Sequence, residues 1–117
     1  NTLTESLLVT GFPYTHDHHY DQGFPLFKTF YDRTQGVRRL GAASLDLCFV
    51  AMGRFEGFWE FGLKPWDICA GEFIARKAGG ITSDWDGNVL PDNGSRILAT
   101  NGHVHHEMLE ILSNNIF

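Results

Sequence analysis

The sequence contains no apolar stretch approaching the roughly 18 residues that cross a membrane, and its first residues, NTLTESLLVT, lack the basic start and cleavage region of a signal peptide. It also has no excess of basic residues, because 9 Lys and Arg stand against 14 Asp and Glu, a formal net charge of -5. Such a chain offers no continuous basic surface for nucleic-acid phosphates or anionic lipid. These features predict a cytoplasmic protein with neither nucleic acid nor a membrane as a partner.

Cysteine is scarce as well, with Cys48 and Cys69 the only two. Both fall within apolar helical patterns, where a free thiol usually behaves as a small hydrophobic side chain, so neither is expected to be catalytic. What the 117 residues do contain is a balance of 43% hydrophobic and 20% charged residues, enough for one hydrophobic core. We therefore expect a single domain spanning residues 1–117.

Short apolar runs alternate with helical patterns along the chain. The run SLLVTGF (6–12) predicts a buried strand leading into the loop 13–23, and loops at that end of parallel strands commonly hold ligands. Further strands are expected at 37–41, 54–62, 80–89 (with a turn) and 96–101, and helices at 24–31, 45–52, 65–78 and 105–116. Strands alternating with helices predict an α/β fold, a layered, mainly parallel or mixed sheet flanked by helices.

The spacing of apolar residues also predicts which faces are buried. In the strand at 54–62, Phe55, Trp59 and Phe61 alternate with Glu56 and Glu60. The expected buried stripes of three helices are Leu45, Cys48, Phe49 and Met52; Trp66, Cys69, Phe73 and Ile74; and Met108 and Leu109 with Ile111 or Leu112.

Asp67 stands beside Trp66 at the start of the helix expected at 65–78. Because Pro65 suits the first helical turn and Gly79-Gly80 the end, Asp67 belongs to the first turn. An acidic residue there is favoured by the helix dipole, by roughly 0.3–1 kcal/mol at an exposed site. A carboxylate fixed at the mouth of a sheet can also hold a hard cation such as Mg²⁺. Spacing alone favours the first interpretation and leaves the second open.

The segment RRLGAASLDLCFVAMGRFEGFWEFGLKPWDICAGEFIARKAGGITSDWDG combines a glycine–small–alanine turn, a strand ending in Trp-Glu and a helix of pattern WD..AG......AGG. In this order these motifs resemble the carboxyl-terminal half of the inositol monophosphatase family, and the GFP after the first strand is most similar to bacterial members. The resemblance runs from LLVTGFP through ILATN, nearly the whole chain. It implies Mg²⁺-dependent hydrolysis of a phosphate monoester, with inositol monophosphate as the representative substrate.

The resemblance also implies roles for residues of this chain. Asp67 matches a ligand of the catalytic Mg²⁺, which makes it a catalytic and a metal-binding residue. Gly41, Ala42 and Ala43 match a turn that contacts the substrate's hydroxyls or phosphate, and Glu60 matches the residue that accepts hydrogen bonds from the sugar hydroxyls. From the residues alone, the turn fits a closely packed helix start better, and Glu60 fits a solvated strand end equally well.

Most metal ligands that the resemblance implies lie in the family's amino-terminal half, in segments of the GEE and DPIDGT types. Neither occurs in these 117 residues, and the chain opens directly on a strand-like run. We therefore expect the substrate-side half of an enzyme, inactive alone, whose partners are a sugar phosphate, the missing amino-terminal half and a second copy in a homodimer. Two departures are Ala42, where the family usually has serine or threonine, and Lys77, where many members carry glutamate.

Two alternatives stay open. One is a related phosphatase with another substrate, such as fructose bisphosphate, histidinol phosphate or a phosphoadenosine nucleotide. Glu60 and the loop around Tyr14 and Thr15 would distinguish these substrates. The other is a non-catalytic binding or oligomerisation module of the same fold.

Other polar residues are expected to have lesser roles. The loop histidines of HDHH, His16–His19, match no standard zinc spacing. Asp46 is expected to be a hydrogen-bonded structural carboxylate. Arg38 and Arg39 either line the substrate entrance or pair with acidic side chains, and Asp84 and Asp86 fit a turn.

Overall fold

The computed structural model describes residues 2–11, 18–89 and 96–114. A short 3-10 helix, Leu3–Glu5, precedes the first strand. The strands are β1 (Leu7–Thr10), β2 (Gly36–Arg38), β3 (Gly57–Phe61), β4 (Ile81–Ser83) and β5 (Arg96–Thr100), and the helices are α1 (His18–Arg33), α2 (Ala43–Ala51), α3 (Pro65–Lys77) and α4 (His105–Ser113). No helix among these described elements is long and apolar enough to cross a membrane.

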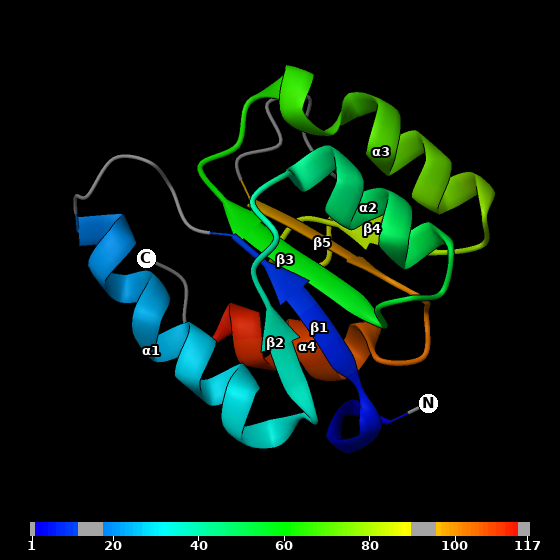
Figure 1. Cartoon of the computed structure of the whole chain (residues 1–117). Helices are drawn as coiled ribbons and strands as arrows, with labels where there is room; N and C mark the ends of the chain where they lie inside the picture. Colours follow the sequence, from blue (N-terminus) through cyan, green and yellow to red (C-terminus); the bar gives the residue numbers. More distant parts are fainter. Residues whose placement is uncertain (1, 12–17, 90–95, 115–117) are drawn as a thin grey trace.

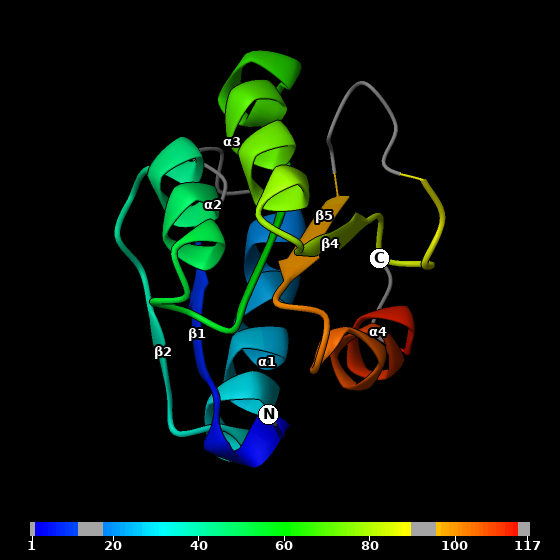
Figure 2. The same ribbon diagram turned by 90° about the vertical axis from the view of Figure 1, so that its right-hand side faces the viewer.

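The five strands form one mixed sheet in the order β2-β1-β3-β5-β4. β1 pairs in parallel with both β2 and β3, whereas β5 is antiparallel to β3 and to β4. Helices α1 and α4 cover one face of this sheet, and α2 and α3 lie side by side on the other (Figure 1; Figure 2). The expected α/β class and mixed sheet are confirmed.

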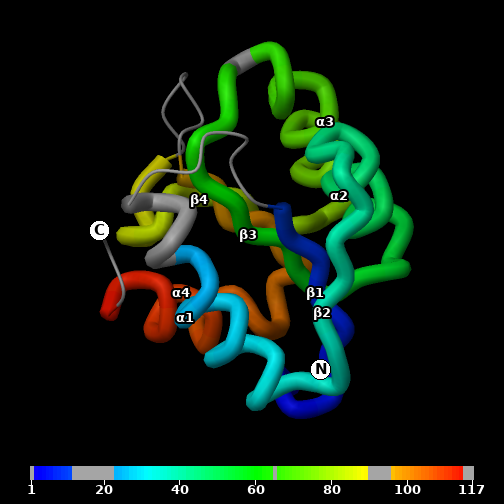
Figure 3. The backbone as a smooth tube through the Cα atoms, turned by 60° about the vertical axis from the view of Figure 1, so that its left-hand side comes forward, coloured from blue at the N-terminus to red at the C-terminus, as the bar shows by residue number. Residues whose placement is uncertain are grey.

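Neighbouring residues of each central strand point into two separate cores, as the alternation of side chains along a strand requires. Leu8, Trp59 and Leu98 pack with residues of α1 and α4, whereas Val9 and Phe58 pack with residues of α2 and α3. Figure 3 shows the two helical layers on opposite sides of the sheet. A sheet covered on both faces leaves little room for a solvated side chain at its centre.

Helix α1 is longer than expected. The sequence predicts a helix only over 24–31, yet α1 begins at His18, inside the expected loop. Pro25 lies within the helix, although proline lacks the N–H that an interior position uses. Burial of Leu26 and Phe30 against the sheet outweighs this local preference.

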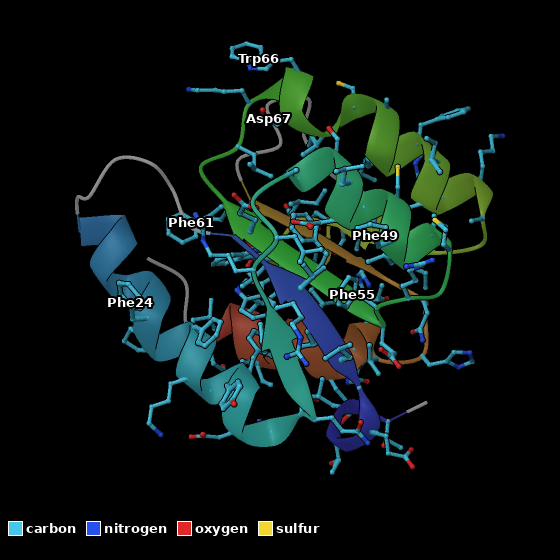
Figure 4. The ribbon with its side chains drawn as sticks, viewed as in Figure 1. Phe24, Phe49, Phe55, Phe61, Trp66 and Asp67 are labelled. Atoms are coloured by element: carbon cyan, nitrogen blue, oxygen red, sulfur yellow. The ribbon has the colours of Figure 1, made fainter. Side chains whose placement is uncertain are left out.

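The predicted buried stripe of α3 is wrong. Trp66, Cys69, Phe73 and Ile74 are all exposed, and the side facing the sheet and α2 carries Ile68, Gly71 and Ala75 instead. Figure 4 shows Trp66 projecting away from the molecule at the start of α3. A Cβ added at Gly71 would lie 2.8 Å from Leu47 Cβ of α2, so small residues are required where these two helices meet.

The predicted face of α2 is wrong in part as well, because Leu45 and Met52 are exposed while Leu47 and Val50 are buried. Trp59 and Phe61 of β3 share one core as expected, but Phe55 precedes the strand and packs in the other core. Glu60, on the opposite side of β3 from Trp59, is buried. In α4, Met108, Ile111 and Leu112 are buried as predicted, and Leu109 is partly buried.

Candidate active site

A cavity of about 120 Å³ lies where the three parallel strands end. Because β1, β2 and β3 run in the same direction, their carboxyl ends meet at one edge of the sheet, and the helices that follow β2 and β3 start there too. The connections from β1 and from β2 cross opposite faces of the sheet, and such a switch point is where open α/β sheets bind ligands. The lining residues are Gly11, Arg39, Gly41, Ala42, Ala43, Asp46, Glu60, Leu63 and Asp67.

Glu60 lies in β3 with only 8% of its surface exposed, so it is not a solvated strand end. Burial and, to a smaller extent, the nearby carboxylates of Asp46 and Asp67 together raise its pKa to about 8, although Arg39 opposes the change. A buried carboxyl group that faces a cavity can hydrogen-bond a hydroxyl group there. This environment is compatible with the substrate contact that the resemblance implies.

Asp67 is the third residue of α3, and its carboxylate caps that helix. The backbone N–H of Lys64 donates to Asp67 Oδ2 at 2.9 Å, and the N–H of Asp67 donates in return to the Lys64 carbonyl at 2.9 Å. The side chain also lines the cavity. Asp67 therefore caps the start of α3 and lies at the mouth of the sheet, and its role as a Mg²⁺ ligand stays a prediction.

The turn 41–43 brings the start of α2 to the same cavity. Gly41 adopts φ +89°, a left-handed conformation that favours glycine, and Ala42 is the N-cap residue. Ala42 has no side-chain acceptor, so its side chain does not cap the first N–H groups of α2, and such uncapped groups can donate to a ligand. Ser44 adds a link that sequence reasoning missed, since its hydroxyl donates to the Asp67 carbonyl at 2.7 Å and ties the first turns of α2 and α3 together.

Asp46 differs from the expected hydrogen-bonded structural carboxylate. It is 1% exposed, and its Oδ1 has no hydrogen-bond partner within the described part of the chain. Burial raises the pKa of its carboxyl group to about 6, and Arg39 opposes this shift. Asp46 lines the cavity together with Glu60.

Gly11 is a further cavity residue that sequence reasoning treated only as a strand end. A Cβ added there would lie 2.5 Å from Glu60 Oε1 and 2.8 Å from Glu60 Cδ. The missing side chain is what leaves space for the Glu60 carboxyl group. The sequence signal for this role was a glycine directly after a buried strand.

The remaining polar candidates lie elsewhere or outside the described residues. Arg39 lines the cavity as expected, but Arg38 does not. Asp84 builds the predicted turn, because its Oδ1 accepts hydrogen bonds from the N–H groups of Asp86 and Asn88, both at 2.9 Å. His16 and Asp17 lie outside the described residues, as do Tyr14 and Thr15, and the side chains of His18 and His19 are not described.

The carboxylates around the cavity do not by themselves satisfy Mg²⁺. This ion requires near-octahedral oxygen ligands, yet the residues that the structure describes include no group of three His, Cys, Asp or Glu side chains able to hold a metal ion. Asp67 can supply one carboxylate, with Oδ2 already engaged by Lys64. These described residues do not form a complete metal site.

The fold and the cavity together define an α/β domain with a small cavity, lined in part by carboxyl groups, at the ends of its parallel strands. The profile of the inositol monophosphatase family, whose members are phosphoric monoester hydrolases, matches residues 1–116, and the chain belongs to this family. It is 48% identical over 112 residues to an inositol-1-monophosphatase from Synechocystis sp., and the matched region is 96% of this chain and 39% of that protein. A protein named Nus factor SuhB from Vibrio cholerae is 34% identical over 113 residues, 97% of this chain and 42% of the relative.

Solved structures agree with this assignment. An inositol monophosphatase from Anabaena (Nostoc) superposes with a TM-score of 0.88 at 41% identity, over 97% of this chain and 46% of that one. The suhB protein of Bartonella henselae gives a TM-score of 0.88 at 32% identity, over 97% and 43% of the two chains. The chain therefore spans less than half the length of the relatives that it matches.

Proposed function

We propose that this chain is the substrate-binding part, corresponding to the carboxyl-terminal half, of a Mg²⁺-dependent phosphomonoesterase that hydrolyses inositol monophosphate. The observation that carries the proposal is the convergence of Gly41, Ala42, Ala43, Glu60 and Asp67 on one cavity, although they come from three different segments of the chain. The same cavity would serve a sister sugar-phosphate specificity. A module that served only in oligomerisation would have no comparable need for buried carboxyl groups facing a cavity.

The chemical division of the site follows from its residues. The uncapped N–H groups at the start of α2 and the Arg39 guanidinium suit the phosphate or a hydroxyl of the substrate. Glu60 suits the hydroxyl groups of the polyol. Asp67 would be one ligand of Mg²⁺, whose role is to stabilise phosphoryl charge and activate a water molecule. The other ligands would come from a further segment of the enzyme.

The test is phosphate release by the complete gene product, with and without Mg²⁺, from inositol monophosphate and from the sister phosphates. We expect Mg²⁺-dependent release, fastest with inositol monophosphate, and none from the 117-residue chain under the same conditions. Faster release from another phosphate would move the assignment to that specificity. Release by the 117-residue chain alone would contradict the division of the site, and no release by the complete product would favour the binding module.

We further propose that the rest of the enzyme docks on an outer face formed by Leu45 of α2, Met52 directly after it, and Trp66, Phe73 and Ile74 of α3, all exposed. The only charged residue of α2 is Asp46, which points inward, so the outward side of this helix is almost entirely apolar. A helix that is apolar all round is normally buried. The part of the relatives' length that this chain does not cover is therefore the occupant proposed for this face.

Position supports this docking, because α2 and α3 both start at the cavity, so a segment packed on their outer face would reach its rim (Figure 1). The cavity is also smaller than the roughly 300–1,000 Å³ typical of ligand pockets, as expected if another segment supplies further walls.

Met52→Glu should destabilise the complete protein by about 3 kcal/mol, because a carboxylate would replace an apolar side chain in the interface. Tyr31→Glu on α1 is the matched control, since Tyr31 is 54% exposed and Met52 64% exposed, on opposite sides of the sheet. Chemical denaturation of both variants measures the difference. Equal stabilities of the two variants would place the docking surface elsewhere. Light scattering reports the oligomeric state, and a homodimer that dissociates only in Tyr31→Glu would assign self-association to α1.

A further inference from the structure

Buried polar side chains in this fold are generally paired. His105, for example, lies between Ser83 Oγ at 2.9 Å and Thr100 Oγ1 at 3.0 Å. Since the Ser83 hydroxyl donates to the Asp84 carbonyl at 2.8 Å, it accepts from His105 Nε2–H, and Nδ1 then accepts from Thr100. The imidazole is thus satisfied on both sides in its neutral form.

Asp46 breaks this pattern. Its Oδ1 is the one buried side-chain nitrogen or oxygen atom without a hydrogen-bond partner among the residues described. Within the described residues, Asp46 forms no ion pair with Arg39, although both side chains line the same cavity. Leaving a buried carboxylate oxygen unpaired is unfavourable for folding, so the position calls for a role other than stability.

The place of Asp46 indicates that role. It lies in the first turn of α2, directly after the turn 41–43, and it borders the cavity together with Glu60. Glu60 comes from the opposite side, from β3, and is likewise buried. Two carboxyl groups on different walls of one small cavity can accept hydrogen bonds from two hydroxyl groups of the same ring.

We infer that Asp46 is a further substrate-binding residue, which selects with Glu60 for a cyclic polyol bearing neighbouring hydroxyl groups. This inference rests on the proposed function and deepens it by naming the part of the substrate that the inner end of the cavity recognises. A bound hydroxyl would donate to the Asp46 carboxylate where that side chain borders the cavity.

The experiment compares wild type, Asp46→Ala and Asp46→Asn of the complete protein on inositol monophosphate and on p-nitrophenyl phosphate, whose leaving group carries no hydroxyl. We expect Asp46→Ala to raise KM for inositol monophosphate by about 10- to 100-fold, the effect of losing a hydrogen bond to a charged group, and to leave p-nitrophenyl phosphate hydrolysis unchanged. Asp46→Asn should lose less, because its amide oxygen can still accept. Equal losses on both substrates, or none on either, would overturn the inference.

Two further measurements separate a substrate-binding role of Asp46 from a structural one. Thermal melting should show Asp46→Asn to be at least as stable as wild type, because the variant removes an unpaired buried charge; a large drop would assign Asp46 to structure. If wild type hydrolyses neither substrate, the proposed function fails. Calorimetry with free inositol then tests whether Asp46 binds the polyol. Binding by wild type that is lost in Asp46→Ala would support the inference, and no binding by wild type would contradict it.

Discussion

Asp67→Asn in the complete protein should lower kcat for Mg²⁺-dependent phosphate release from inositol monophosphate by about 100-fold or more. Asparagine keeps the size of the side chain and an oxygen that can accept the Lys64 N–H bond, so the start of α3 should remain intact. The negative charge that would bind Mg²⁺ is lost. The measurement is kcat over a range of Mg²⁺ concentrations, because a lost ligand should also raise the concentration needed for half-maximal rate.

Asp86→Asn is the matched control for this experiment. Asp86 is exposed in the turn after β4, and only its N–H takes part in the hydrogen bonding with Asp84. We expect its kcat and Mg²⁺ dependence to equal those of wild type. If Asp67→Asn also keeps full activity but melts at a lower temperature, Asp67 is a helix cap and nothing more.

The residues alone predicted a ligand site only at the loop after the first strand, and the roles of Glu60 and Asp67 came from the family resemblance; that these residues meet follows from strand direction in the structure. Gly11, Arg39 and Glu60 each lie at or just beyond the end of a parallel strand, and parallel strands end at one edge. Asp67 follows from the same rule, as the helix after β3 must start at that edge. Strand order and helix capping are thus enough to bring these residues together.

The buried faces of α2 and α3 could not be predicted from apolar spacing. Spacing identifies an apolar stripe, but it does not say which neighbour covers the stripe. In α3 the side toward the sheet and α2 is built from small residues, Gly71 and Ala75, because the helix packs closely there, while Trp66 and Phe73 face outward. The apolar stripe therefore points to what we propose is a further segment of the enzyme.

Asp46 shows a second limit of sequence reasoning. A carboxylate within an apolar helical pattern normally indicates a hydrogen-bonded structural role, since burying an unpaired charge is costly. Whether the partner exists depends on side chains brought in by other segments, and here Oδ1 finds none in the described residues. The exception was visible only in three dimensions, and it is also where a ligand is expected.

The two glycines that follow α3 meet different physical requirements, and this leads to a prediction of a large effect on stability. Gly79 adopts φ +94°, and its N–H donates to the Arg76 carbonyl, while the Gly80 N–H donates to the Ala75 carbonyl at 2.9 Å. This is the Schellman arrangement of a helix end. A Cβ at Gly79 would meet nothing within 4 Å, whereas at Gly80 it would lie 2.7 Å from the Thr100 carbonyl oxygen and 2.9 Å from that of Ala75.

Gly80→Ala should therefore destabilise the complete protein by about 3 kcal/mol, because both clashing atoms belong to the backbone of α3 and β5 and cannot rotate away. Gly79→Ala should lose only about 1 kcal/mol, the penalty of a left-handed conformation for a residue with a Cβ. Denaturant midpoints, compared at equal slope, measure both values. Equal losses at the two positions would show that backbone conformation alone accounts for this glycine pair, and that α3 does not need its close approach to β5.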